Sequence, residues 1–278
     1  MLFFENNAVN EAQKLLFNQA KGETDSAHRL LEFRNVSVKR PGGTQLVNLN
    51  LSIGQGENVV VLGPEGSGKD LFSDLVTCKI KPDQGEVFFL GQNIHEKEGD
   101  ELETYRSCIA YVSYNFGLIN NLSIIDNVIL PLRYHTSLSE TELVKRAESF
   151  LQRFQLMHVR DLRPQMVRHS EALRAAFARA MILQPMLVFI DHAFASQCPI
   201  ALSKFLDSAR EEFADKQITF LMTSFEYGYF HRHTQRYLLL YEGQVVFRGS
   251  REDLERAENP YIRQFTQTPL EGPMQSFM

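Results

Sequence analysis

The sequence predicts an α/β fold built around a largely parallel β-sheet, on three observations. Residues 57–63 form a nearly continuous apolar run that ends in glycine, as a strand buried on both faces does. Strand-like segments later in the chain alternate with helical stretches, which favours parallel pairing. A long helical block divides the core into two halves. The later strands are expected at 186–191, 218–224 and 236–247, the helical stretches around 199–214 and 225–232, and the block at 122–183.

The segments on either side of the central run are expected to form further strands. Residues 30–38 and 45–53 alternate apolar and polar side chains, as half-buried antiparallel strands do. Residues 85–91 and 108–112 follow as further short strands. We therefore expect an antiparallel β subdomain beside the main sheet.

Three helices are expected within the helical block. Residues 123–135 form the first, and the alanine-rich residues 172–183 form the third. The second begins at Ser139, which forms a capping box with Glu142. Its apolar side chains fall on one face at helical spacing. These are Leu143, Ala147, Phe150, Leu151 and Phe154.

Composition limits the classes of function. The chain has 278 residues, 44% hydrophobic and 23% charged, which suits one globular domain with a subdomain. A net charge of −5 argues against nucleic acid as a partner. The three cysteines form no CxxC pair, so neither a zinc site nor a disulfide framework is expected. No apolar run is long enough to span a membrane, so any link to one requires a partner.

Residues 63–69, GPEGSGK, have the G-x-x-x-x-G-K spacing of a phosphate-binding loop. The motif follows the buried strand and precedes an expected helix at 70–77, which is the context that it requires. Glycines let backbone N–H groups face a phosphate, and the helix N-terminus adds positive potential. Lys69 would add a point charge. The residues expected to line the site are Gly63, Pro64, Glu65, Gly66, Ser67, Gly68, Lys69, Asp70 and Leu71.

Asp70 departs from the usual motif, which has Ser or Thr after the lysine to bind Mg²⁺. A carboxylate there would bind Mg²⁺ directly but would also repel phosphates. Alternatively, Asp70 stabilises the helix dipole from the first turn and takes no part in binding. The sequence leaves both readings open.

The order of elements resembles that of ABC transporter ATPases, from about Leu31 to the C-terminus. It is also similar to the ATPase subunits of Mla/MCE-type lipid transporters. Three segments carry this likeness, namely 116–133, 174–191 and the tail 259–273. The resemblance implies a P-loop NTPase of the ABC-cassette type, with the antiparallel β subdomain and an inserted helical subdomain.

The resemblance also places the family's nucleotide-contacting motifs on this chain. The aromatic residue that stacks on adenine falls near Arg40, and the Q-loop glutamine falls on Tyr114. The signature LSGGQ loses both glycines, so its backbone cannot approach a phosphate as closely. The corresponding residues here are Val167, Arg168, His169, Ser170 and Glu171.

The catalytic positions implied by the resemblance are altered as well. The Mg²⁺-associated aspartate is kept as Asp191, but the catalytic glutamate is His192. The D-loop is residues 195–198, ASQC, and the switch histidine is Ser224. Asp70 and Asp191 remain the only candidate metal ligands. No catalytic position is intact apart from the retained Asp191.

These changes together imply little or no ATP hydrolysis. Phosphoryl transfer depends on positioning and charge stabilisation, and the loss of one part commonly costs a factor of about 10³ or more. In the family, each composite site joins one chain's P-loop to the other chain's signature, and this chain alters both. We therefore expect binding of ATP and Mg²⁺ to be weak or absent.

The resemblance further implies partners and a location. An integral membrane permease and an MCE-type protein are expected, with a homodimer or a heterodimer with another ATPase subunit, peripheral at the cytoplasmic face of the inner membrane. Residues 1–30 are an N-terminal extension, 31–115 the core with the P-loop, 116–183 the helical subdomain with the signature, 184–250 the second half of the core, and 251–278 a dimer-contact tail.

The sequence is compatible with three functions. The first is a pseudo-ATPase with a structural or regulatory role under an Mla/MCE-like permease. The second is an active or weakly active ATPase that uses Asp70 and His192 in non-standard roles. The third is a soluble regulator that no longer binds a permease.

Overall fold

The main sheet lies at the centre of the fold, and its strand order is β10-β9-β3-β8-β7-β6. The computed structural model describes residues 29–194, 206–207, 218–228, 233–267 and 271–274. All neighbouring strands of this sheet run parallel except the pair β9 and β10, so the predicted largely parallel sheet is confirmed. The strands are β3 (Val59–Leu62), β6 (Ile109–Ser113), β7 (Leu187–Asp191), β8 (Thr219–Ser224), β9 (Arg236–Tyr241) and β10 (Gln244–Gly249).

A second, antiparallel sheet packs beside the first, with the order β2-β1-β4-β5. β1 lies between β2 and β4 and pairs antiparallel with both, which confirms the predicted antiparallel subdomain. The strands of this second sheet are β1 (Arg29–Lys39), β2 (Gln45–Gly54), β4 (Gln84–Phe89) and β5 (Gln92–Asn93).

The apolar run of β3 is explained by burial on both faces. Val60 and Leu62 belong to the apolar core shared with the helical block. Val59 and Val61 belong to the core shared with the antiparallel sheet. Because neighbouring side chains of a strand point to opposite faces, all four positions must be apolar. The phosphate loop begins where this strand ends.

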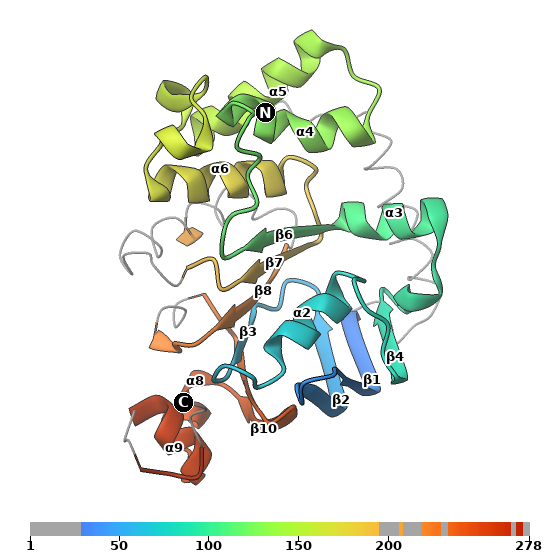
Figure 1. Cartoon of the computed structure of the whole chain (residues 1–278), viewed down its shortest axis with the longest axis vertical. Coiled ribbons are helices and arrows are strands. Elements are labelled where there is room, and N and C mark those ends of the chain that lie inside the picture. Colours follow the sequence, from blue (N-terminus) through green and yellow to red (C-terminus); the bar gives the residue numbers. More distant parts are fainter. Residues whose placement is uncertain (1–28, 195–205, 208–217, 229–232, 268–270, 275–278) are drawn as a thin grey trace.

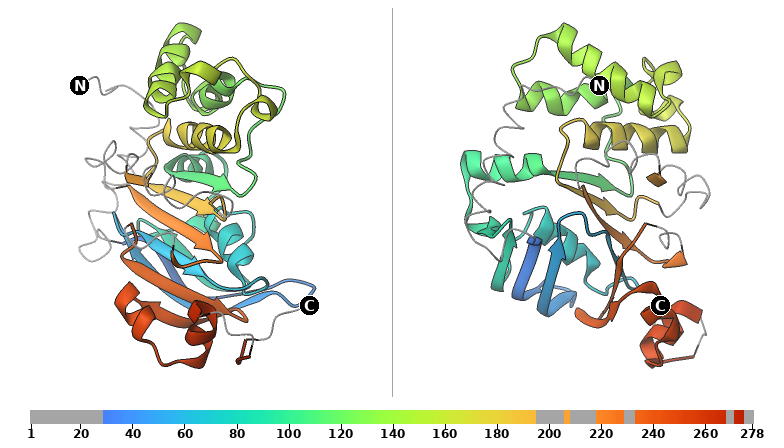
Figure 2. Two further views of the ribbon diagram at one scale, coloured as in Figure 1. Left: turned by 90° about the vertical axis from the view of Figure 1, so that its left-hand side faces the viewer. Right: turned by 180° about the vertical axis from the view of Figure 1, so that it is seen from behind.

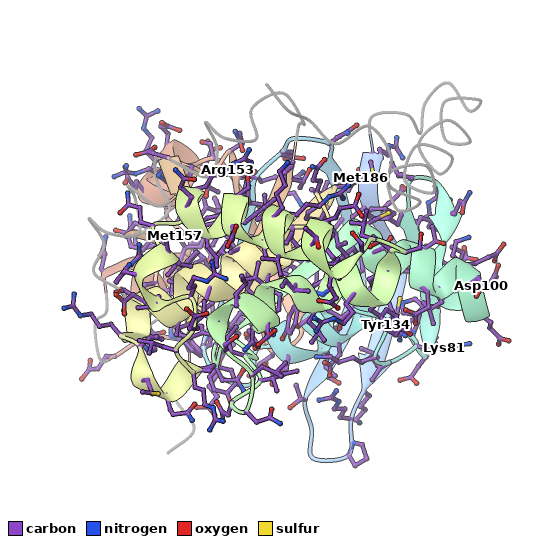
Figure 3. The ribbon with its side chains drawn as sticks, turned by 90° about the horizontal axis from the view of Figure 1, so that it is seen from above. Lys81, Asp100, Tyr134, Arg153, Met157 and Met186 are labelled. Carbon is purple, nitrogen blue, oxygen red and sulfur yellow. The ribbon has the colours of Figure 1, made fainter. Side chains whose placement is uncertain are left out.

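The helical block forms one end of the molecule, at the top of Figure 1. Its helices stack beyond β6, as the side views of Figure 2 show. The predicted capping box of the second helix is present, with the Ser139 side chain accepting the Glu142 N–H. Figure 3 looks down on this end and shows Tyr134, Arg153 and Met157 on its surface. The helices are α4 (Ile124–His135), α5 (Glu140–Arg153) and α6 (His169–Met181), with the 3₁₀ turns η2 (Met157–Val159) and η3 (Pro164–Met166).

The remaining helices lie around the two sheets. α3 has no counterpart in the sequence prediction, because it is mostly polar and only Tyr105, Ser107 and Cys108 of it are buried. None of the helices within the described ranges has an apolar stretch long enough to cross a bilayer. The elements are α2 (Lys69–Val76), η1 (Ile94–Glu96), α3 (Gly99–Cys108), α8 (Arg251–Arg256) and α9 (Pro260–Gln267).

Helix α9 of the tail packs against its own chain. Its Ile262 is 3% exposed and joins the core shared with the helical block. The ring of Tyr261 lies 5.1 Å from that of Tyr241. The dimer-contact role of the tail stays a prediction. The N-terminal extension up to residue 28 and most of the helical stretch expected around 199–214 lie outside the described residues.

Candidate functional site

The backbone of the phosphate loop is held in a tight cradle between β3 and α2. A Cβ on Gly63 would lie 2.5 Å from both the Leu240 carbonyl oxygen and the Ser67 hydroxyl. Gly68 has φ +100, and a Cβ there would lie 2.7 Å from the Gln45 carbonyl oxygen. Only glycine fits these two positions. Pro64, Glu65 and Gly66 form the outer part of the loop.

Lys69 is folded into its own loop. Its ammonium donates to the carbonyl oxygens of Gly63 at 2.6 Å and Pro64 at 2.7 Å, and to the Ser67 hydroxyl at 3.2 Å. The side chain is only 3% exposed. Burial lowers the pKa of Lys69 to about 8, against the opposing charges of nearby carboxylates. A lysine has three N–H donors, so the loop itself uses them all.

The next two residues point in different directions. Asp70 is exposed in the first turn of α2, where a negative charge favours the helix dipole. Leu71 is fully buried in the core beneath the antiparallel sheet. The apolar side chain of Leu71 is therefore explained by packing in the core.

Asp191, at the end of β7, is surrounded by hydroxyl donors. One carboxylate oxygen accepts from the Tyr111 hydroxyl at 2.7 Å and from the Ser73 hydroxyl at 3.0 Å. The other accepts from the Thr223 hydroxyl at 2.6 Å. Burial and the bond to Asp191 raise the pKa of Tyr111, so its hydroxyl keeps its proton and donates. The three hydroxyls were not predicted, although Ser73 lies one helical turn after Lys69.

His192 follows Asp191 in a left-handed backbone conformation with φ 52. Its N–H donates to the Thr223 hydroxyl oxygen at 3.2 Å. Its ring stacks on that of Phe225, with 4.3 Å between ring centroids. Burial and the nearby Lys69 charge lower the pKa of His192, so its imidazole is neutral at pH 7. The residue sits where a solvent-exposed base would be needed, but an aromatic ring covers it.

Phe225 was missed by the sequence analysis. Its ring centroid lies 4.6 Å from the Lys69 ammonium. Lys69, Phe225 and His192 follow β3, β8 and β7, respectively. These are neighbouring parallel strands, and their carboxyl ends meet at one edge of the sheet. That topology was the signal that would have placed Phe225 in the site. The Ser224 hydroxyl, at the switch position, is hydrogen-bonded to the backbone of Glu226.

Arg40 is held away from a stacking role. Its guanidinium is paired with the Asp74 carboxylate on α2. The Lys79 ammonium lies 3.7 Å from the same carboxylate. An arginine committed to this ion pair offers a nucleotide base less of its planar face.

Tyr114 lies at the surface, with 70% of its side chain exposed. The turn that follows it is fixed from α6, because the Arg179 guanidinium donates to the carbonyl oxygens of Gly117 at 2.6 Å and Phe116 at 2.9 Å. Burial lowers the pKa of Arg179 without removing its charge. The turn is thus rigidly connected to the helix that carries the signature segment.

The signature segment, Val167 to Glu171, leads into α6, which begins at His169. Glu171 accepts from the Arg168 N–H at 2.8 Å and contacts the His158 ring nitrogen at 3.0 Å. The bond from the Arg168 N–H is the main reason that the pKa of Glu171 is lowered. The His169 ring lies 4.6 Å from that of Phe116, while Ser170 is exposed. The D-loop residues 195–198 lie outside the described residues.

The family is decided by a direct match. A model described as ABC transporter matches residues 46–195, more than half of the chain. The chain belongs to the ABC transporter family. It is the nucleotide-binding subunit of an ABC transporter, and the family implies ATP binding, typically with Mg²⁺.

The chain is similar to ATP-binding proteins of several ABC transport systems. It is 28% identical over 249 residues to the intermembrane phospholipid transport system ATP-binding protein MlaF of Escherichia coli K12, covering 90% of this chain and 93% of that protein. It is also 28% identical over 233 residues to the phosphonates import ATP-binding protein PhnC of Treponema denticola, covering 81% and 91%.

Solved structures confirm the cassette fold. A dimeric post-hydrolysis state of the ATP-binding cassette MJ0796 bound to ADP and Pi matches with a TM-score of 0.72 and 26% identity, over 80% of this chain and 98% of that one. A nucleotide-free ATP-binding cassette from an ABC transporter matches with a TM-score of 0.73 at 20% identity. The expected ABC-cassette architecture is therefore correct.

The loop glycines and the surroundings of Lys69 and Asp191 bear on different parts of Mg-ATP. The glycines of the loop have the positive φ values that turn backbone N–H groups toward a bound phosphate. The ring of Phe225 covers the lysine that would meet the terminal phosphate. Both oxygens of Asp191 already accept hydroxyl hydrogens. Within the described ranges, no group of three or more His, Cys, Asp or Glu side chains is arranged to hold a metal ion.

Proposed function

We propose that this ABC chain is the nucleotide-binding-domain subunit of an Mla/MCE-like lipid transporter and that it acts as a pseudo-ATPase with a structural or regulatory role. The similarity to MlaF along 90% of the chain supports the lipid-transport branch. The partners are an integral membrane permease and an MCE-type protein. The chain sits at the cytoplasmic face of the inner membrane as a homodimer or as a heterodimer with another ATPase subunit.

The arrangement of Phe225, Lys69 and His192 carries the proposal. A terminal phosphate must reach the Lys69 ammonium, but the loop carbonyls and the Phe225 ring surround it. A catalytic base must reach a water, but His192 stacks on the same ring. One side chain therefore blocks two of the parts that phosphoryl transfer needs.

Four of the five regions of the chain then have assigned tasks. Residues 31–115 and 184–250 keep the cassette core, and 116–183 present the helical subdomain to the permease. Residues 251–278 contact the second subunit. The retained Arg179 clamp on the turn after Tyr114 supports a scaffold role, because it keeps this surface rigid without any nucleotide.

The experiment is an ATPase assay on the complex purified from its native membrane through a tag on this chain, with Lys69→Ala as the matched control. If a second ATPase subunit is present, its own phosphate-loop lysine is mutated in both samples. Equal release of phosphate from the two samples is expected. Turnover that disappears in the Lys69→Ala complex contradicts the proposal. Purification of the chain without any polytopic membrane protein favours the soluble regulator instead.

The active-ATPase alternative has one observation in its favour. The pKa of His192 is lowered, so a neutral imidazole is available to accept a proton. That reading requires Phe225 to leave the His192 ring and Asp70 to hold the Mg²⁺. The same assay on a His192→Asn complex separates the two functions, because only an active enzyme loses turnover on this change.

A further inference from the structure

Phe225 is held in place by its own turn. The Ser224 hydroxyl donates to the Glu226 carbonyl oxygen at 2.9 Å and accepts the Glu226 N–H at 3.0 Å. Hydroxyl turns of this kind fix the direction of the intervening residue. The ring that projects between them is 49% exposed, yet it stacks on His192 and faces Lys69. Phe225 is therefore an ordered cover with one face in solvent.

The ring covers Lys69 and His192. The loop backbone that would receive other phosphates is a separate surface, because the first N–H groups of α2 have no partner within the helix. Gly66, in the outer part of the loop, is exposed, and a Cβ there would meet nothing within 4 Å, so the backbone at this point is open to an anion. A ligand can therefore use the backbone without reaching the Lys69 ammonium.

The charges around the loop also limit the ligand. Glu65 and Asp70 are exposed carboxylates close enough to act on Lys69. Each added phosphate charge is repelled by both. A divalent cation would relieve this repulsion, but at Asp191 it would compete with the hydroxyls of Tyr111, Ser73 and Thr223.

We propose that Phe225 makes this loop selective for a diphosphate group, bound without a divalent cation, over a triphosphate. The ring occupies the place that the third phosphate would take beside Lys69. The two-phosphate ligand is held by the loop backbone and leaves the ring in position. This inference rests on the proposed function, since it concerns the ligand of the same degenerate site.

The test is calorimetry on the full chain with ADP, ATP and pyrophosphate, each in EDTA and in Mg²⁺. Four proteins are compared, namely the natural chain, Phe225→Ala, Phe225→Tyr and Tyr134→Ala. The Tyr variant keeps a ring over Lys69. Tyr134 is 74% exposed on α4, which lies at the helical end of the molecule, away from α2 (Figure 1), and it controls for the loss of an aromatic side chain. Circular dichroism checks that each variant is folded.

In EDTA the natural chain is expected to bind ADP about tenfold more tightly than ATP, the size expected when a cation–π contact and a ring stack must be given up. Mg²⁺ should not favour ATP. Phe225→Ala should bring the two affinities within about twofold, while Phe225→Tyr and Tyr134→Ala keep the preference. Pyrophosphate bound as tightly as ADP assigns recognition to the diphosphate group, and weaker pyrophosphate binding adds a nucleoside contribution.

Three results overturn the inference: equal affinities for ADP and ATP in the natural chain, a preference that survives in Phe225→Ala, or no binding of any of the three ligands. None of these restores hydrolysis, so the proposed function would stand. Turnover in the purified complex would instead contradict the proposed function whatever the calorimetry shows.

Discussion

Replacing Asp191 with alanine is expected to destabilise the fold even in the absence of nucleotide and metal. The carboxylate accepts hydrogen bonds from Tyr111, Ser73 and Thr223, and through Thr223 it also orients the His192 backbone. Alanine would leave three hydroxyls without their acceptor. A carboxylate reserved for a metal has the opposite behaviour, because its removal usually leaves a metal-free fold as stable as before or more so.

The magnitude follows from the number and burial of these bonds. A hydrogen bond to a charged group contributes about 1.5–3 kcal/mol, and an orphaned buried donor costs about 1–3 kcal/mol. The site is only partly buried, so water replaces some of what is lost. We expect Asp191→Ala to lower the free energy of unfolding by about 3 kcal/mol. Asp70→Ala, at an exposed position in the same site, should cost under about 1 kcal/mol.

Urea unfolding of the three proteins in EDTA, followed by circular dichroism, measures both values. The reasoning is refuted if Asp191→Ala is as stable as the natural chain, or if it loses no more than Asp70→Ala. It is also refuted if Mg²⁺ alone stabilises the natural chain but not Asp191→Ala, because the carboxylate would then be available to a metal.

Three further outcomes are expected, each measured by urea unfolding. Burial, with the nearby Lys81 charge, lowers the pKa of His95 to about 4, so the unfolded chain binds the extra proton between about pH 4 and pH 6.5. The natural chain should thus lose about 2 kcal/mol more than His95→Gln between about pH 7 and pH 5, and equal losses would contradict this. Gly243→Ala places a Cβ 2.3 Å from a backbone carbonyl oxygen, whereas Gly42→Ala meets nothing within 4 Å, although both have positive φ. Gly42→Ala should cost about 1–2 kcal/mol and Gly243→Ala clearly more, with similar losses counting against the close approach. Asn127 is fully buried and makes four hydrogen bonds to the backbone, so Asn127→Ala should cost about 3 kcal/mol, and a loss below about 1 kcal/mol would show that the amide is dispensable.

The fold was predictable because its signals are local. The apolar run of β3, the glycine spacing of the loop and the Ser139 capping box each require only neighbouring residues to be recognised. α3 was missed because ten mostly polar residues give no clear period, and three buried side chains are enough to dock it.

The site was predictable only where a motif marks it. Lys69 and Asp191 stand at motif positions, so their place at the sheet edge could be expected. Phe225 stands at no such position and reaches Lys69 only because β8 and β3 are neighbours. The hydroxyl of Tyr111 comes from β6, which is paired with β7, so its contact with Asp191 depends on tertiary structure in the same way.

The most direct measurement of the central claim is a single-turnover experiment with the tagged complex in excess over ATP labelled at the γ-phosphate, in Mg²⁺. If a second ATPase subunit is present, it is inactivated by mutation of its own phosphate-loop lysine. Because product release cannot limit the signal, even one slow hydrolysis event per site is detected. The structure predicts no labelled phosphate beyond that released by the Lys69→Ala complex. A burst of labelled phosphate that depends on Lys69 would show that this site hydrolyses ATP, and it would contradict the account.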